Sequence, residues 1–208
     1  MTTFYFIRHG QTDANVAGIK QGTINDERTH LTATGINQVA QLHAAFTLDF
    51  ADALFCSPLD RTRETAAILN QAAKLPVTLD DRLLEISYGS WDGKRNADLL
   101  AAFPDVFNPT LQDVLPSYVD YATGGESFAA VRKRVANFMA DRAAENPDGQ
   151  IICVTHGFTV KAAALVALQP ENPMTLPEPE NASVTKITLK SDGRYFVWYY
   201  NRTSSSAF

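Results

Sequence analysis

The chain has 208 residues, of which 45 % are apolar and 20 % charged, and its 18 Lys and Arg against 23 Asp and Glu give a formal net charge of −5. A chain of this length buries roughly 70 % of the surface that its unfolded form exposes, so it can form a core of its own. These values exclude a disordered chain, a collagen-like repeat and a disulfide scaffold, and the acidic balance argues against nucleic-acid binding.

Apolar segments that end in polar residues predict strands buried on both faces, over residues 3–8, 53–56 and 151–155. Segments that precede or separate them carry an amphipathic pattern, which predicts helices over residues 34–46, 60–73 and 127–144. Because strands alternate with helices, we expect a parallel sheet joined by crossover helices. Near the end of the chain, a closing β-hairpin is predicted by residues 184–189 and 194–199.

Residues 91–123 differ from the rest of the chain, because Pro104, Pro109 and Pro116 interrupt short apolar segments there. This stretch predicts a lid inserted over one end of the sheet. We therefore expect an α/β fold, a three-layer sandwich with a mostly parallel central sheet flanked by helices and a small lid insertion. It forms a single domain over residues 1–203, followed by a C-terminal tail over residues 204–208.

No signal for export or membrane insertion is visible, since the N-terminus lacks a basic region followed by an apolar stretch and no run of about 20 apolar residues occurs. We expect a cytoplasmic protein whose partner is a small molecule, with no nucleic acid and no membrane. The sequence implies no particular oligomeric state. Cys56 and Cys153 lie in predicted strands, where a thiol is usually a small buried apolar group.

Ligands of an open α/β sheet bind at the carboxyl ends of the strands, so the residues that end the predicted strands are the first candidates for a site. Arg8 and His9 follow the first strand, and His156 follows the strand over residues 151–155. The other two histidines, His30 and His43, show no spacing typical of metal ligands, so no metal site is predicted.

Two imidazoles at adjacent strand ends, with Arg8 beside them and Arg61 from the start of a helix, form a cationic cleft in an acidic protein. Such a cleft predicts an oxyanion pocket, because a guanidinium group forms bidentate hydrogen bonds with phosphate and stays charged. A neutral imidazole can attack phosphorus and accept the phosphoryl group. Neighbouring cations keep its pKa low enough to leave a free lone pair.

The residues around these positions resemble the histidine phosphatase superfamily, in the branch similar to phosphoglycerate mutase. The matching stretches follow the order of the family over residues 4–160. They are Phe6 to Thr12 with Asn15, Gln21-Gly22 with Leu31-Thr32 and Gly35, Ser57 to Arg61 with Glu64 to Ala66, Leu84 to Ile86 with Gly89, Trp91 and Gly93, Gly124 to Ser127, and Val154 to Gly157.

The resemblance implies a role for each matched residue. His9 is the nucleophile that becomes phosphohistidine, Glu85 is the proton donor, and the phosphoryl oxygens are held by Arg8, Arg61 and His156. Phosphate or substrate contacts are implied for Asn15, Gln21, Gly22 and Gly157. Gly157 is expected to let its backbone approach the phosphate. Protein groups supply the positive charge in this scheme, so no metal and no cofactor are expected.

Alternatives remain at three of these positions and for the function. The two histidines can be read as hydrogen-bonded structural residues, and Arg63 is the rival of Arg61. The same fold can also serve as a phosphoglycerate mutase or as a non-catalytic binding module.

We expect a phosphomonoesterase that acts on a small organic ester, because residues 96–123 contain no Lys or Arg and an acidic lid repels multiply charged anions. The acidic residues of that segment are Asp98, Asp105, Asp113 and Asp120. Its aromatic residues, the candidate walls for an uncharged leaving group, are Phe103, Phe107, Tyr118 and Tyr121.

Overall fold

A computed structural model describes residues 1–206 of the chain. Its centre is a sheet of six strands in the order β3-β2-β4-β1-β5-β6. The strands are β1 (Thr2–Arg8), β2 (Ala53–Cys56), β3 (Val77–Leu79), β4 (Gln150–Thr155), β5 (Val184–Leu189) and β6 (Tyr195–Arg202). The first four of these run parallel, whereas β5 is antiparallel to β1 and β6 is antiparallel to β5. The prediction of a mostly parallel sheet with a closing hairpin is confirmed.

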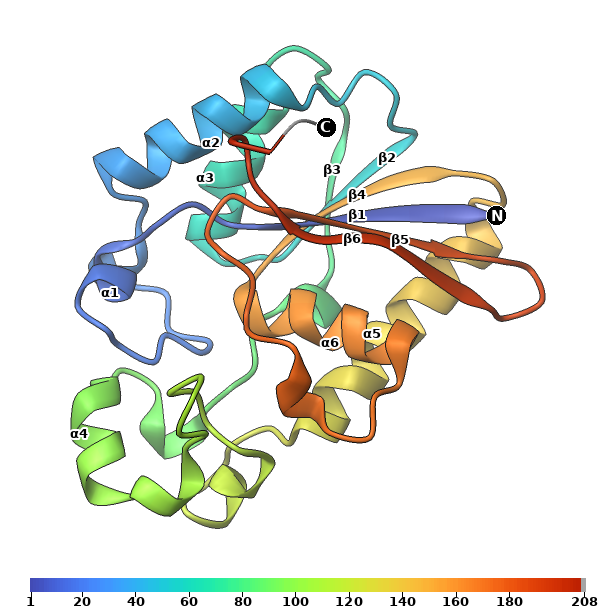
Figure 1. The fold of residues 1–208 in the computed structure, drawn as a ribbon. Coiled ribbons are helices and arrows are strands. Elements are labelled where there is room, and N and C mark those ends of the chain that lie inside the picture. The colour runs from blue at the N-terminus through green and yellow to red at the C-terminus, as the bar shows by residue number, and fades with distance from the viewer. Residues whose placement is uncertain (207–208) are drawn as a thin grey trace.

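Helices cover both faces of this sheet, so the molecule has three layers. Figure 1 shows α2 and α3 above the sheet and α5 and α6 below it. The helices are α1 (Asp13–Val16), α2 (Ala33–Ala45), α3 (Asp60–Leu69), α4 (Asn96–Ala102), α5 (Phe128–Glu145) and α6 (Gly157–Leu168). The predicted α/β three-layer sandwich is confirmed.

Alternation along β1 explains why this strand is apolar throughout. Phe4 and Phe6 belong to the core between the sheet and helices α5 and α6. Tyr5 and Ile7 belong to the core between the sheet and helices α2 and α3. All four side chains are buried. Successive side chains of a strand point to opposite faces, so a strand with a hydrophobic layer on each side needs apolar residues at every position.

Helix α6 has no amphipathic pattern from which the sequence could predict it. Ten of its twelve residues are buried, from Gly157 to Val166. A helix that is apolar all round belongs in the interior, and its periodicity gives no signal. The short strand β3 and the helices α1 and α4 were not predicted either, and the helix expected over residues 60–73 ends at Leu69.

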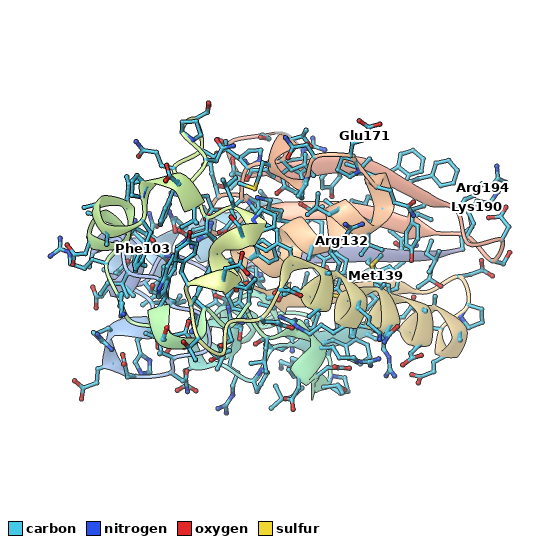
Figure 2. All side chains as sticks on the ribbon, turned by 90° about the horizontal axis from the view of Figure 1, so that it is seen from below. Phe103, Arg132, Met139, Glu171, Lys190 and Arg194 are labelled. Carbon is cyan, nitrogen blue, oxygen red and sulfur yellow. The ribbon has the colours of Figure 1, made fainter. Side chains whose placement is uncertain are left out.

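The insertion, residues 91–123, is a small helical unit at the carboxyl ends of the parallel strands (Figure 1). Its core is aromatic, because the ring of Trp91 stacks on Phe103 at 5.2 Å and on Phe107 at 6.3 Å between centroids. Figure 2 shows Phe103 at one end of the molecule, with Lys190 and Arg194 of the β5–β6 turn at the other. The aromatic residues therefore hold the insertion together.

Other predictions concern the cysteines, the membrane and the tail. Cys56 and Cys153 are free and buried, as expected. Within residues 1–206, no helix combines the length and the apolar character needed to span a bilayer. The last two residues of the tail predicted over 204–208 lie outside the described residues.

Candidate active site

Sheet register brings the two motif histidines together. Arg8 at the end of β1 is paired with Thr155 at the end of β4, so the residues that follow, His9 and His156, leave the sheet side by side. Their ring centroids are 5.3 Å apart. Both side chains are buried, and among the charged groups around them are Arg61 and Arg8.

His9 is held in one orientation by its own chain. Its Nδ1 donates a hydrogen bond of 2.7 Å to the carbonyl oxygen of Gly10. A carbonyl oxygen only accepts, so the proton is on Nδ1 and Nε2 carries the free lone pair. Burial, followed by the charges of Arg61 and Arg8, lowers the pKa of His9 well below 6.5. The ring is therefore a neutral nucleophile at neutral pH.

His156 is fixed differently, because both of its ring nitrogens have protein partners. Nε of Arg61 donates to its Nδ1 at 3.2 Å, so its proton is on Nε2, which donates to the hydroxyl of Ser57 at 2.7 Å. Burial and then Arg61 lower the pKa of His156 well below 6.5. In this structure the ring orients Arg61, and a contact with a phosphoryl oxygen needs one of these two hydrogen bonds to be exchanged.

Arg61 enters from the first turn of α3 and is fully buried. Besides His156, its guanidinium donates to the carbonyl oxygens of Gly22 at 2.8 Å and Ile24 at 3.0 Å. Three of its five N–H groups are thus used and two remain for an anion. Burial lowers the pKa of Arg61 to about 10, so it stays cationic at neutral pH. The rival Arg63 is exposed and pairs with Asp60 at 3.3 Å.

Arg8 is held in place by the segment that precedes β5. Its guanidinium donates to the carbonyl oxygen of Pro179, while its buried Nε has no hydrogen-bond partner among the described residues. A Cβ atom on Gly157 would lie 3.0 Å from Cζ of Arg8 and 2.4 Å from Oε2 of Glu178. In this structure Gly157 leaves room for the Glu178 carboxylate and the Arg8 guanidinium, a reason other than the predicted approach of its backbone to phosphate.

Glu85 lies against the N-terminus of α6. Its carboxylate accepts hydrogen bonds from the backbone N–H groups of Ile86 at 3.0 Å and of Phe158 and Thr159, both at 3.2 Å. These bonds fix the carboxylate beside the helix end, where a negative charge is favourable. Glu85 also lines the cavity that contains His9.

Asn15 and Gln21 are positioned by hydrogen bonds to Thr12. Oδ1 of Asn15 accepts from the backbone N–H of Thr12 at 3.1 Å and from the side chain of Asn181 at 3.3 Å. Oε1 of Gln21 accepts from the Thr12 hydroxyl at 3.0 Å. With both oxygens engaged, the amide nitrogens of Asn15 and Gln21 remain as donors. The neighbouring Gly22 has φ +48°, and a Cβ there would collide with Asp92.

These side chains share a cavity of about 320 Å³. It is lined by seven of the nine predicted site residues, which are Arg8, His9, Asn15, Gln21, Gly22, Arg61 and Glu85. His156 and Gly157 lie behind its wall. Within residues 1–206, no three His, Cys, Asp or Glu side chains are grouped so that they could hold a metal ion.

Sequence reasoning missed other residues of the cavity wall, which include Lys20, Tyr88, Asn96, Gln112 and Glu178. Lys20 and Asp113 form an ion pair of 2.9 Å, and the fully buried Lys161 of α6 lies 3.9 Å from the same carboxylate. Glu178 stands in a Pro-Glu-Pro-Glu segment that is typical of an exposed loop, so the sequence carried no signal for it.

Two expectations about the insertion are wrong. Neither the four aromatic residues nor the acidic residues at 98, 105 and 120 line the cavity. Phe107 and Tyr118 are buried in the core of the insertion, and Tyr121 is 52 % exposed. Asp113, the acidic residue of the insertion that does line it, is neutralised by Lys20. Apolar aromatic side chains are more stable packed on Trp91 than facing a polar cavity.

A family model described as the histidine phosphatase superfamily (branch 1) matches residues 4–202. The chain belongs to this family. Among its relatives is a phosphoserine phosphatase 1 of Hydrogenobacter thermophilus, 28 % identical over 162 residues, which are 78 % of this chain and 74 % of the relative. Another is a glucosyl-3-phosphoglycerate phosphatase of Mycobacterium tuberculosis, 32 % identical over 194 residues, 88 % of this chain and 83 % of the relative.

The fold of this histidine phosphatase also agrees with a solved structure. Bacillus stearothermophilus YhfR superposes with a TM-score of 0.83 at 26 % identity, over 98 % of both chains. The family membership and the named relatives support phosphatase activity on a small substrate, as the sequence predicted.

Proposed function

We propose that the protein hydrolyses a small phosphate monoester through a phosphohistidine formed on Nε2 of His9. The observation that carries this proposal is the hydrogen bond from Nδ1 of His9 to Gly10, which leaves Nε2 as the nucleophilic atom in a cavity shared with Arg8 and Arg61. The two remaining N–H groups of Arg61 and the free Nε of Arg8 are suited to binding the phosphoryl oxygens.

In the first step, the Nε2 lone pair of His9 forms the bond to phosphorus while the bond from phosphorus to the ester oxygen breaks. The protonated carboxyl of Glu85 gives its proton to the leaving oxygen, so an alcohol departs instead of an alkoxide. In the second step, the Glu85 carboxylate takes a proton from water, whose oxygen attacks phosphorus. The bond to Nε2 then breaks, inorganic phosphate leaves, and both residues return to their initial states.

Two broader features belong to the same proposal. Residues 91–123 serve as the lid of a single domain over residues 1–203, because Asp113 brings this insertion to the cavity. Both cysteines are free, which fits a reducing compartment, and we place the enzyme in the cytoplasm.

The nucleophile is tested with His9→Ala. We expect turnover of 4-nitrophenyl phosphate to fall by at least about a thousandfold, because the phosphoryl acceptor is removed. His43→Gln, a histidine substitution on α2 outside the cavity, is the control and should keep wild-type turnover. After reaction with a radioactive phosphate ester, the wild-type protein should carry a covalent label that acid removes and alkali does not, as for phosphohistidine. His9→Ala should carry no such label. Equal turnover by wild type and His9→Ala would favour the non-catalytic module instead.

The proton donor is tested with Glu85→Gln and two substrates that differ in leaving group. We expect the loss of kcat/KM, which reports the step in which the ester bond breaks, to be at least about tenfold greater for an alkyl phosphate than for 4-nitrophenyl phosphate, because nitrophenolate leaves without being protonated. Steady-state rates of both esters with both proteins provide the measurement. A loss of the same size for the two esters would assign Glu85 to positioning alone.

A further inference from the structure

Glu178 is a carboxyl group in the cavity that the proposed reaction does not use. It lies in the segment between α6 and β5, and it lines the same cavity as His9. A Cβ on Gly157 would approach both Oε2 of Glu178 and Cζ of Arg8, so the carboxylate and the guanidinium border the same point. Glu178 therefore faces the space beside the phosphate-binding arginine.

The backbone around Glu178 restricts its movement. Pro177 and Pro179 flank it, and proline fixes its own φ and restricts the residue before it. The carbonyl oxygen of Pro179 also accepts a hydrogen bond from Arg8. The backbone of Glu178 is thus tied to the arginine of the cavity.

The charges around Glu178 do not neutralise it. The ionisable groups that face it, from every element packed against it, are Arg8, Lys20, Glu85, Tyr88, Asp113 and Tyr200. Lys20 is already paired with Asp113 at 2.9 Å. Burial, followed by Asp113, raises the pKa of Glu178 to about 7, although Arg8 opposes this shift. Its carboxyl therefore changes charge close to neutral pH.

Amide groups on the same wall offer partners for hydroxyl groups. Asn96 and Gln112 line the cavity, and Oδ1 of Asn96 is buried without a hydrogen-bond partner among the described residues. A side-chain amide carries both donor and acceptor groups, so the amides of this wall can pair with a hydroxyl group in either direction. A carboxylate or phosphate at this position has no hydrogen to donate and adds a negative charge.

We propose that Glu178 determines the specificity of the leaving group: its carboxylate disfavours alcohols that carry a carboxylate or a second phosphate, and the wall accepts uncharged, hydroxyl-bearing alcohols. This inference rests on the proposed phosphatase function and names the class of substrate for the same cavity. Like charges in a shielded cavity repel each other more strongly than in water. Asp113 of the insertion is paired with Lys20 at 2.9 Å, whereas Glu178 forms no ion pair among the described residues.

The test uses glycerol 3-phosphate and 3-phosphoglycerate, which share a three-carbon skeleton and differ by a hydroxymethyl group in place of a carboxylate. Each is measured as a competitive inhibitor of 4-nitrophenyl phosphate hydrolysis, so a constant is obtained whether or not the ester is turned over. The readout is the ratio of the two inhibition constants at about pH 6 and about pH 8, for wild type, Glu178→Gln and Glu180→Gln. Glu180 is exposed, and its variant is the matched control.

In wild type we expect the inhibition constant of 3-phosphoglycerate, relative to that of glycerol 3-phosphate, to be several-fold higher at about pH 8 than at about pH 6, because Glu178 loses its proton in between. In Glu178→Gln the ratio of the 3-phosphoglycerate constant to the glycerol 3-phosphate constant should not change with pH. At about pH 8 it should be about tenfold lower than in wild type. Glu180→Gln should behave as wild type.

Two outcomes overturn the inference. The first is a wild-type ratio of inhibition constants that does not change between about pH 6 and about pH 8, a result that needs no variant. The second is a Glu178→Gln protein in which both inhibition constants change by the same factor, because Glu178 would then act on Arg8 and not on the leaving group. A wild-type protein that fails to hydrolyse 4-nitrophenyl phosphate contradicts the proposed function itself, which is a separate result.

Discussion

At the scale of single residues, partners decide what two identical side chains do. His9 donates to a carbonyl oxygen through Nδ1 and keeps a free lone pair on Nε2. His156 accepts from Arg61 and donates to Ser57, so neither of its nitrogens is free. One histidine is thus suited to attack phosphorus and the other to orient an arginine, although both follow a strand and precede a glycine.

The charge state of the nucleophile gives a prediction for NMR of protein labelled with 15N-histidine. His9 should remain neutral as the pH falls through 6.5, because burial and then Arg61 and Arg8 lower its pKa. The exposed His30 is the internal control, since its hydrogen bond to Glu64 raises its pKa above 6.5. His30 should therefore gain its proton first. A His9 signal that titrates at or above the His30 signal would contradict the assigned cause.

At the scale of elements, one ion-pair cluster connects the insertion to the rest of the molecule. Asp113 comes from the insertion, Lys20 from the loop after α1, and Lys161 from the buried helix α6. Nζ of Lys161 has no hydrogen-bond partner among the described residues. Its ion-pair partner is the carboxylate of Asp113, at 3.9 Å. Asp113 therefore keeps a buried cation compensated and also holds the insertion against the cavity.

Substitution within this cluster should be asymmetric. Asp113→Asn leaves Lys161 buried without a counter-charge, so we expect the free energy of unfolding to fall by about 3 kcal/mol. Lys161→Met removes the buried cation while Asp113 keeps Lys20, and the expected loss is under about 1.5 kcal/mol. Urea unfolding of both variants measures the difference. Equal losses would mean that the two lysines do not share Asp113 as the distances indicate.

At the scale of the whole molecule, an acidic chain concentrates positive charge in one place by burying it. Arg8, Arg61 and two histidines come from three separate segments and meet at the strand ends. The histidines are accommodated there because they stay neutral, and their low pKa couples the folding of the whole chain to pH.

This coupling predicts how stability depends on pH. Below the unfolded pKa of 6.5 the unfolded state binds protons that the folded His9 and His156 do not, so stability is complete above this value and falls with the pH below it. Each histidine contributes up to about 1.4 kcal/mol per pH unit. The slope of the free energy of unfolding should therefore decrease by about that amount in His9→Gln, as measured by urea unfolding. An unchanged slope would show that His9 gains a proton in the folded protein.

Short-range patterns in the sequence were enough for much of the fold and for the site motifs. The continuous apolar run of β1 indicated a strand buried on both faces, and the residues after β1 and β4 indicated His9 and His156 at adjacent strand ends. Helix α6 escaped prediction because a helix buried on all sides has no periodic pattern. The patterns that predicted structure correctly are local ones, in which the polarity of each residue reflects its own burial.

Only the tertiary structure decided which groups face the cavity. The aromatic residues of the insertion could have lined it, and instead Phe103, Phe107 and Tyr118 pack on Trp91. Glu178 is far from His9 in the sequence, and both Glu178 and Lys20 resemble ordinary surface charges there, yet they line its cavity. Contact between distant segments depends on how layers and loops pack, which local sequence does not encode. The sequence by itself predicted the residues of the proposed phosphoryl transfer, and packing determined which other side chains line the cavity around them.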